Sequence, residues 1–403
     1  MKASLRLAAS TMLTLSMGVV AFGQHYTQTN LVSNTSGTAP VNDPQLVNSW
    51  GLSRGSNTPW WVSDANAGVA TIYDGAGNKQ SLVVTIPPND PNNPQTPTGA
   101  PSGIIFNNSP NDFLLAPGVS ATFIFATLDG SIAAWNANFG LADGQAAPST
   151  HAVTIVKTTD GSAYTGLASA FIAGRRFLYA ANSAKGTVDV FDNAFNRADL
   201  RQSMFQDNSD GYTVADAQAN APFVDQLLPA GFVPFNVQAI GNDIVVTYAL
   251  HQEGEQDVTA GPGLGFVDIY SATGRLLRRL EHGSWLNAPW GVALAPLDFG
   301  RFSHHLLVAQ FAEASNTLSS GFIAAYDLAT GKFAGLLEDA NGVPIAINGI
   351  WSISSGGFSS VNNDPKASPA QQLYFTAGPN DEHDGLFGYL TPVAADLVEG
   401  SNQ

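Results

Sequence analysis

Trp50-Gly51-Leu52 is the first of six short apolar stretches that have a glycine or an asparagine at the centre. The other five are Ser102-Gly103-Ile104, Thr165-Gly166-Leu167, Phe235-Asn236-Val237, Trp290-Gly291-Val292 and Asn348-Gly349-Ile350. They recur at intervals of roughly 50 to 70 residues, which indicates a repeat architecture. Glycine and asparagine tolerate unusual backbone angles, so each stretch indicates a strand whose backbone is constrained or closely approached by a neighbour near the axis of a ring.

Further apolar runs follow each of these stretches in a fixed order. The second runs are residues 60–63, 122–126, 177–181, 244–248, 305–309 and 372–376. The third runs each carry an aromatic residue near the end and are residues 69–73, 131–135, 187–191, 266–270, 322–326 and 386–390. A fourth run follows in five units, for example residues 80–86 and 274–280, whereas the sixth unit lacks one.

Six four-stranded units without helical periodicity predict an all-β chain that forms one six-bladed β-propeller over residues 24–393. Residues 26–33 alternate like a strand and precede the first unit. We therefore expect this N-terminal strand to supply the missing outer strand of the sixth blade and to close the ring. A β-sandwich is the alternative fold, but six units in phase argue against it.

The first 23 residues have the features of a secretory signal peptide. Lys2 and Arg6 precede an apolar stretch over residues 7–20, and Ala21-Phe22-Gly23 offers a small-x-small cleavage site. We expect a mature chain that begins at Gln24, is exported to the periplasm or the extracellular space, and has no integral membrane segment after cleavage. Residues 394–403 are expected to be a polar C-terminal tail.

The composition narrows the classes of function. Among 403 residues, 44% are hydrophobic and 12% charged, and there is no cysteine, which removes disulfides, thiolate metal sites and cysteine nucleophiles. The formal net charge is −16, from 16 basic and 32 acidic residues, and loss of Lys2 and Arg6 makes it −18. Such a surface repels nucleic acid and anionic lipid, so neither is an expected partner.

One segment resembles a known propeller repeat. Trp61-Val62-Ser63-Asp64-Ala65-Asn66-Ala67-Gly68-Val69-Ala70-Thr71-Ile72-Tyr73-Asp74 is similar to an NHL-type repeat, and residues 177–192 are similar to a second copy. The family typically has a basic residue where this chain has Ala67 or Gly68. The mature chain also resembles a family of uncharacterised exported bacterial proteins, some with a C-terminal PEP-type sorting tail that this sequence lacks. The resemblance implies a propeller fold and export, and it implies no chemistry.

Long loops are expected to gather on one face of the propeller, around its central channel. Each of these loops joins the second strand of a blade to its third strand, or joins one blade to the next. The long loops are residues 87–100, 206–231, 251–265, 311–321 and 377–385. These loops are rich in carboxylates, which suggests either solvated loop charge or a site for calcium or another hard cation. No segment has EF-hand spacing, so calcium is a possible cofactor that no motif requires.

Lactonase-like propellers place metal ligands directly after the second strand of each blade. The corresponding residues here are Asp64, Thr127, Asn182, Tyr248, Gln310 and Ala377. Only one of them is acidic, which departs from the Glu, Asn and Asp set expected of calcium-dependent lactonases. Catalytic residues and metal ligands are therefore not assigned.

Other side chains are candidates for ligand contact on the same face. His251 and His383 fall in long loops beside Glu253 and Glu382, where a histidine and a carboxylate could transfer protons or bind a metal. Trp50 and Trp290 could stack on a sugar or an aromatic ligand, or pack against other blades. The predicted ligand-binding residues are Trp50, Asp64, Asn182, His251, Trp290, Gln310 and His383.

Three classes of function follow from the sequence. The first, which we favour, is an exported propeller that binds a small molecule, a glycan or a protein on its loop-rich face. The second is a metal-dependent hydrolase or lyase of the lactonase type. The third is a structural protein of the cell surface or matrix. Missing catalytic motifs favour a non-enzymatic role, although a fold does not fix a function.

Overall fold

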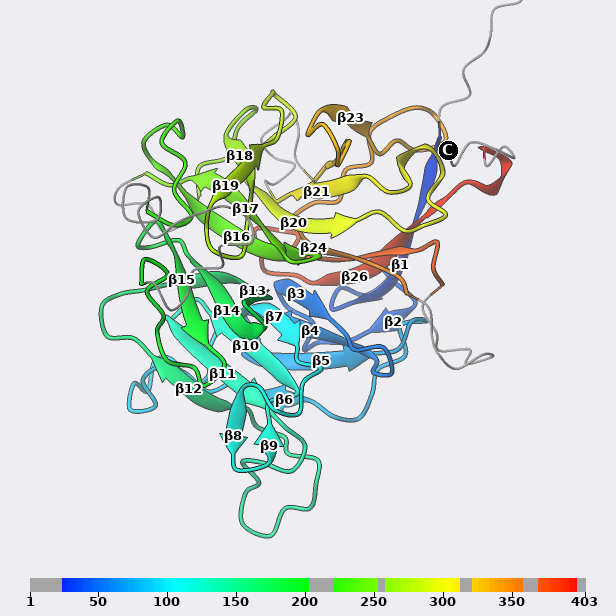
Figure 1. The fold of residues 1–403 in the computed structure, drawn as a ribbon. Helices are drawn as coiled ribbons and strands as arrows, with labels where there is room; N and C mark the ends of the chain where they lie inside the picture. Colours follow the sequence, from blue (N-terminus) through cyan, green and yellow to red (C-terminus); the bar gives the residue numbers. More distant parts are fainter. Residues whose placement is uncertain (1–23, 203–220, 253–257, 312–320, 358–368, 397–403) are drawn as a thin grey trace, which may run out of the picture.

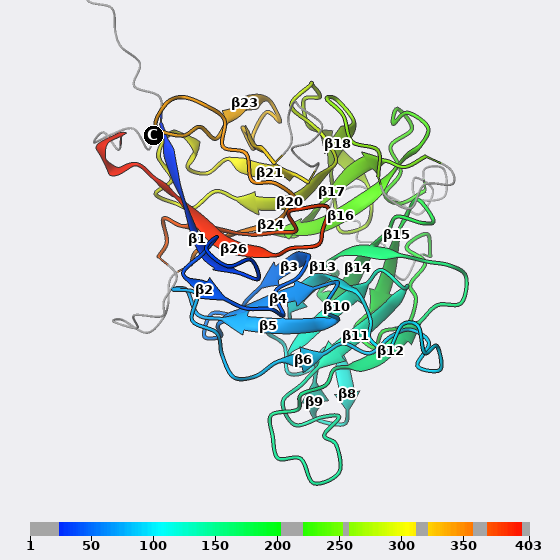
Figure 2. The same cartoon turned by 180° about the vertical axis from the view of Figure 1, so that it is seen from behind.

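Six antiparallel sheets stand around a central axis, as Figures 1 and 2 show from opposite sides. This computed structural model describes residues 24–202, 221–252, 258–311, 321–357 and 369–396. The predicted all-β, six-bladed β-propeller is confirmed. The predicted signal peptide, residues 1–23, lies outside the described residues.

The first three blades have the predicted order of strands from the axis outward, but the described residues of blade 3 do not include the predicted fourth strand. Blade 1 consists of β3 (Ser49–Ser53), β4 (Trp60–Asp64), β5 (Val69–Tyr73) and β6 (Val84–Thr85). Blade 2 consists of β7 (Pro101–Phe106), β10 (Phe123–Thr127), β11 (Ser131–Trp135) and β12 (Val153–Lys157), and the hairpin of β8 (Leu114–Ala116) and β9 (Val119–Ser120) projects from it (Figure 1). Blade 3 has, among the described residues, β13 (Tyr164–Ile172), β14 (Arg175–Asn182) and β15 (Thr187–Asp192).

The other three blades complete the ring. Blade 4 consists of β16 (Phe232–Ile240), β17 (Asp243–Leu250), β18 (Gly265–Tyr270) and β19 (Leu276–Arg279). Blade 5 consists of β20 (Pro289–Leu294), β21 (Leu306–Gln310), β22 (Ile323–Tyr326) and β23 (Phe333–Leu336). Blade 6 contains β24 (Ile350–Ser355), β25 (Leu373–Ala377) and β26 (Leu386–Pro392). Short 3-10 helices span Gly300–Phe302 and Ala394–Asp396.

The N-terminal strand closes the ring, as the sequence predicts. β1 (Tyr26–Ser33) pairs antiparallel with β26, from Tyr26 opposite Pro392 to Ser33 opposite Leu386. The short strand β2 (Val41–Asn42) then pairs parallel with the end of β1. Blade 6 is thus built from both ends of the described chain, which lie side by side in Figures 1 and 2. Within the described residues, no helix is both long and apolar enough to cross a bilayer.

The recurring glycines let the inner strands of neighbouring blades approach closely. A Cβ added to Gly51 would lie 2.4 Å from the carbonyl oxygen of Ser102, and one added to Gly103 would lie 2.5 Å from the nitrogen of Leu167. Each inner strand also has a register shift at this point of its pairing with the second strand. The predicted close approach near the axis is confirmed for these glycines.

The sixth repeat, however, was placed three residues too early. The register of β24 with β25 aligns Trp351-Ser352-Ile353, not Asn348-Gly349-Ile350, with the inner stretches of the other blades. Gly349 precedes β24 with a left-handed φ of 62°, and a Cβ there would meet the backbone of Gly378 in the same blade, so this glycine does not serve the approach of two blades. The sequence was misleading because serine replaces the expected glycine in blade 6.

Candidate binding face around the central channel

The second strands of all six blades end on the same face, which we call the loop face. β4 ends at Asp64, β14 at Asn182, β21 at Gln310 and β25 at Ala377, and each inner strand begins beside such an end. The loops between second and third strands and the connections between blades therefore emerge together around the channel. The predicted long loops 251–265 and 311–321 therefore start and end on this face, and their residues 253–257 and 312–320 lie outside the described residues.

Aromatic side chains fill the axis of the ring. They form one buried cluster that contains Trp50 of β3, Phe235 of β16, Trp290 of β20, Trp351 of β24 and Phe311, which follows β21. Trp351 is stacked between Trp50 and Phe311, with ring centroids 3.5 and 3.6 Å away. Trp290 meets Trp50 and Trp351 edge-on at 5.8 and 5.7 Å. We call these five residues the aromatic plug.

The indole nitrogens of the plug have different environments. Trp290 Nε1 donates to the carbonyl oxygen of Thr165 at 3.0 Å, and Trp351 Nε1 donates to Asn48 Oδ1 at 2.9 Å. Trp50 Nε1 is buried and has no hydrogen-bond acceptor among the residues that the structure describes. The structure thus places the predicted residues Trp50 and Trp290 against each other, both at most 4% exposed.

Sequence reasoning missed three members of the aromatic plug. Trp351 lies in a Trp-Ser-Ile stretch that matches Trp290-Gly291-Val292 except at its centre, so a search that allowed serine there would have found it. Phe235 lies beside the asparagine of the fourth inner stretch, and no local pattern marks it as a channel residue. Phe311 directly follows a second strand, one position beyond the residues considered as metal ligands.

Asp64 is held inside its own blade. Its carboxylate accepts hydrogen bonds from the Ser49 hydroxyl at 2.8 Å and from the hydroxyl and backbone nitrogen of Thr71 at 2.6 and 3.2 Å. The side chain is fully buried, and this burial raises the pKa of the Asp64 carboxyl well above its usual range, against the effect of the hydrogen bonds. Asp64 therefore links three strands of blade 1.

Asn182 and Gln310 are also held by neighbouring groups. Asn182 Nδ2 donates to Ser162 Oγ at 2.9 Å and to Asp189 Oδ2 at 3.0 Å. Gln310 Oε1 accepts a hydrogen bond from the backbone nitrogen of Asn287 at 2.9 Å, and Gln310 Nε2 donates to the carbonyl oxygen of Val308 at 3.0 Å. Both side chains are buried. The amides thus support the blades rather than lie open to the channel.

The two predicted histidines lie on different blades. His251 follows β17 of blade 4 and is half-buried, and its neighbour Glu253 lies outside the described residues. His383 is exposed in the loop between β25 and β26 of blade 6, where its ring nitrogen lies 3.1 Å from the carbonyl oxygen of Asn380. Glu382 accepts a hydrogen bond from Asn48 at 2.6 Å. This bond connects the blade 6 loop to blade 1 and, through Asn48, to Trp351 of the aromatic plug.

The part of the chain that the structure describes holds no group of three or more histidine, aspartate or glutamate side chains that could bind a metal ion. Around the channel, Leu128, Val258 and Ala260 pack on the aromatic plug and are partly exposed. The centre of the loop face is thus apolar, and carboxylates such as Asp129 lie beside it.

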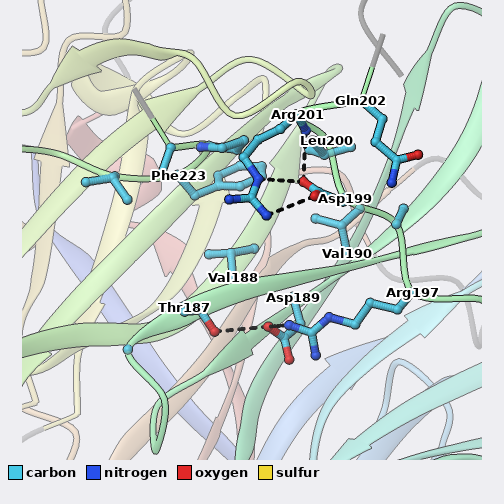
Figure 3. Close-up of a pocket in the computed structure, with 15 residues that line it drawn as sticks. Thr187, Val188, Asp189, Val190, Arg197, Asp199, Leu200, Arg201, Gln202 and Phe223 are labelled. Atoms are coloured by element: carbon cyan, nitrogen blue, oxygen red, sulfur yellow. Dashed lines mark hydrogen bonds and ion pairs between the residues drawn. The ribbon is translucent and has the colours of Figure 1, made fainter. Parts of the chain in front are cut away.

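A separate cavity of about 390 Å³ lies near the outer strand of blade 3 (Figure 3). Val188, Leu200 and Phe223 give it apolar walls. Arg197 pairs with the buried Asp189 at one side, and Asp199 and Arg201 form a bidentate pair at 2.8 and 2.9 Å at the other. The residues 206–220 of a predicted long loop lie outside the described residues, and no sequence pattern indicated this cavity.

Two relatives are uncharacterised proteins of one virus. One uncharacterised protein of Acanthamoeba polyphaga mimivirus is 27% identical over 367 residues, which cover 89% of this chain and 78% of the relative. A second uncharacterised protein of the same virus is 27% identical over 370 residues, with coverage of 89% and 84%. No protein-family model matches the chain.

Some solved structures are also similar to the chain, at low sequence identity. Virginiamycin B lyase from Staphylococcus aureus is 9% identical, with a TM-score of 0.44, and the match covers 92% of this chain and 100% of the lyase. The WD40 propeller domain of Doa1 is 11% identical, with a TM-score of 0.43 and coverage of 87% and 95%. The six sheets of the chain itself show its fold: the chain is a β-propeller.

Proposed function

We propose that this protein is an exported binding propeller whose loop face contacts a small molecule, a glycan or a protein partner. The observation that carries the proposal is the aromatic plug, which gives the channel mouth an apolar centre. Asp64, Asn182 and Gln310 are engaged within their blades, so the polar groups nearest the channel serve its architecture. Export rests on the basic, apolar and small-residue pattern of residues 1–23.

An apolar centre beside polar loops is the usual anatomy of a binding surface. Three partly exposed apolar residues pack against the aromatic plug on the loop face. They are Leu128, Val258 and Ala260. Within the plug, the ring of Trp351 stacks on those of Trp50 and Phe311 at 3.5 and 3.6 Å, and a support that is already packed lowers the entropy cost of binding. Carboxylates nearby disfavour polyanionic ligands.

The experiment is a binding screen with two matched variants. Purified residues 24–403 are tested on glycan and peptide arrays, and each hit is measured again with Leu128→Asp and with Leu297→Asp. Leu297 is exposed between β20 and β21, at the opposite end of the strands. We expect Leu128→Asp to weaken binding by at least about tenfold and Leu297→Asp to leave it unchanged, since a buried unpaired charge costs several kcal/mol.

Two results would contradict this function. Ligands that bind Leu128→Asp as well as the parent chain would place the binding surface elsewhere. A rise of several degrees in melting temperature with calcium, reversed by EDTA and accompanied by hydrolysis of a lactone, would support the alternative of a metal-dependent hydrolase or lyase instead.

A further inference from the structure

Residues 221–228, which we call the strap, cross the seam between blades 3 and 4. The ring of Phe223 lies 5.6 Å from Tyr179 of β14 and 5.4 Å from Tyr270 of β18, and the backbone nitrogen of Phe223 donates to the carbonyl oxygen of Gly274 at 2.9 Å. Strap residues line both the 390 Å³ cavity and a second cavity of about 320 Å³. The strap therefore forms part of the wall of both cavities.

One charged contact fixes the strap to blade 4. Asp225 of the strap pairs with Arg279 of β19, and Arg279 Nε also lies 3.6 Å from Oδ1 of Asp268 on β18. The side chains of Asp225 and Asp268 are 3% and 0% exposed. Two buried carboxyl groups thus face a single guanidinium.

The remaining neighbours of Asp268 do not balance the charge. Tyr270 Oη lies 3.3 Å from Asp268 Oδ2 and 2.7 Å from Tyr248 Oη, so this chain of hydroxyls supplies hydrogen bonds but no positive charge. An uncompensated buried carboxylate is costly, and a bound proton removes that cost. A carboxyl group that keeps its proton can also donate a hydrogen bond to the other carboxylate.

The neighbouring blade provides an internal comparison. Asp189 of β15 is equally buried and pairs with Arg197 alone, while Tyr164, Asn182 and Thr187 donate hydrogen bonds to it at 3.0 Å. One carboxylate therefore meets one guanidinium in blade 3, whereas two carboxylates share one in blade 4. Of these two blades, blade 4 is therefore the one with an excess carboxylate at its arginine, at the site that fixes the strap.

The electrostatic surroundings agree with this charge count. Burial, followed by the charge of Asp225, raises the pKa of Asp268 to about 7, and Arg279 offsets only part of the shift. A hydrogen bond between the two carboxyl groups acts in the same direction. Asp268 thus exchanges its proton near neutral pH.

We propose that a proton held between Asp225 and Asp268 keeps the strap on blade 4, and that loss of this proton above neutral pH releases the strap and opens the seam between blades 3 and 4. The released state separates the two carboxylates, so Asp225 becomes solvated. The device is independent of the loop face, and its test does not depend on a ligand.

Hydrogen exchange of residues 221–231, followed by mass spectrometry and corrected for intrinsic exchange rates, tests the proposal on the chain of residues 24–403. Between pH 6 and pH 8.5 we expect strap opening to increase roughly tenfold, as proton linkage requires for a group near pH 7. Asp268→Asn keeps the shape and supplies a neutral donor, so its strap should open equally at both pH values. The exposed Asp298→Asn should behave like the parent chain.

Asp225→Asn keeps the test decisive if Asp268→Asn fails to fold. It leaves Asp268 opposite Arg279 in a one-to-one pair, and the strap should then remain docked at pH 8.5. Equal opening of the parent strap at both pH values would overturn the proposal. So would a tenfold pH effect that persists in both asparagine variants.

Discussion

The inner strands need glycine where the backbone of the next blade leaves no room for a side chain. Gly51, Gly103 and Gly291 each lie so close to the next blade that a Cβ would come within 2.3 to 2.5 Å of a backbone atom. Where the inner residue has a side chain, the blades are joined differently. Asn236 Nδ2 donates to the carbonyl oxygen of Trp290 at 2.8 Å, and near Ser352 the hydroxyl of Thr376 donates to the carbonyl oxygen of Trp50 at 2.6 Å.

Gly51→Ala should therefore destabilise the propeller. The added methyl group meets the backbone of β7, which cannot move without shifting blade 2, so we expect a loss of about 1–3 kcal/mol in the free energy of unfolding. Ser352→Ala, at the corresponding position of blade 6, should change it by less than about 0.5 kcal/mol. Urea unfolding measures both. Equal effects of the two substitutions would show that the close approach at Gly51 has no special cost.

At the scale of the elements, β1 carries the closure of the ring. It covers the edge of β26 over seven paired positions, and Tyr26 donates a hydrogen bond to the carbonyl oxygen of Phe299 in blade 5 at 2.9 Å. Without β1 the last blade would end in an exposed strand edge, which is a template for association with other chains. Closure by the first strand also joins distant parts of the chain into one cooperative unit.

A chain that begins at Asn34 should lose this closure. We expect it to elute as aggregates in size-exclusion chromatography and to unfold without a sharp transition, because the edge of β26 is open. Addition of a synthetic peptide of residues 24–33 should restore a monomeric peak, since the same strand can pair from outside. A monodisperse truncated chain with an unchanged melting temperature would show that β1 is dispensable.

The sequence predicted elements well where a local pattern specifies them. The predicted bounds are correct for the third strands Val69–Tyr73 and Ser131–Trp135, which a terminal aromatic marks, and for the closing strand Tyr26–Ser33, which alternation marks. The fourth strand predicted over residues 80–86 is reduced to Val84–Thr85, since outer strands pair on one side only. The sixth inner stretch was misplaced because Ser352 breaks the glycine pattern.

The whole molecule contains contacts that no local pattern specifies. Trp351 bonds to Asn48 across the ring closure, and the strap brings Asp225 to Arg279 and Asp268. Such pairs depend on the position of entire blades, so the sequence could name Trp50 and Trp290 as channel candidates but not their stacking partners. It could not reveal the shared guanidinium at all.

Buried carboxyl groups make the stability of the whole propeller depend on pH. The pKa of Asp268 is about 7 in the folded chain against 3.8 as the ordinary value, so the folded state binds this proton more tightly than the unfolded state. Its contribution to stability is complete below about pH 4 and is lost as the pH rises towards 7. Burial shifts the pKa of Asp64 in the same direction.

Carboxylates in turns give the stability of the fold the opposite dependence on pH. Hydrogen bonds from Thr330 hold the pKa of Asp327 below its usual value, and those from Val343 and Asn341 do the same for Asp339. Groups of this kind stabilise the fold above about pH 4, and their contribution is lost as the pH falls further. The two sets of groups together limit maximal stability to the range between about pH 4 and pH 6.

We therefore expect the melting temperature of residues 24–403, measured by calorimetry from pH 3 to pH 9, to peak in that range and to be several degrees lower at pH 8. Asp64→Asn and Asp268→Asn should each reduce the fall in melting temperature above pH 6, because an amide has no proton to lose. Neither substitution should change the decline below pH 4, which belongs to the turn carboxylates. A melting temperature at pH 8 that equals or exceeds the value at pH 5 would contradict the assignment of Asp64 and Asp268 as protonated core groups, and would require both carboxylates to be compensated by charges in the folded state.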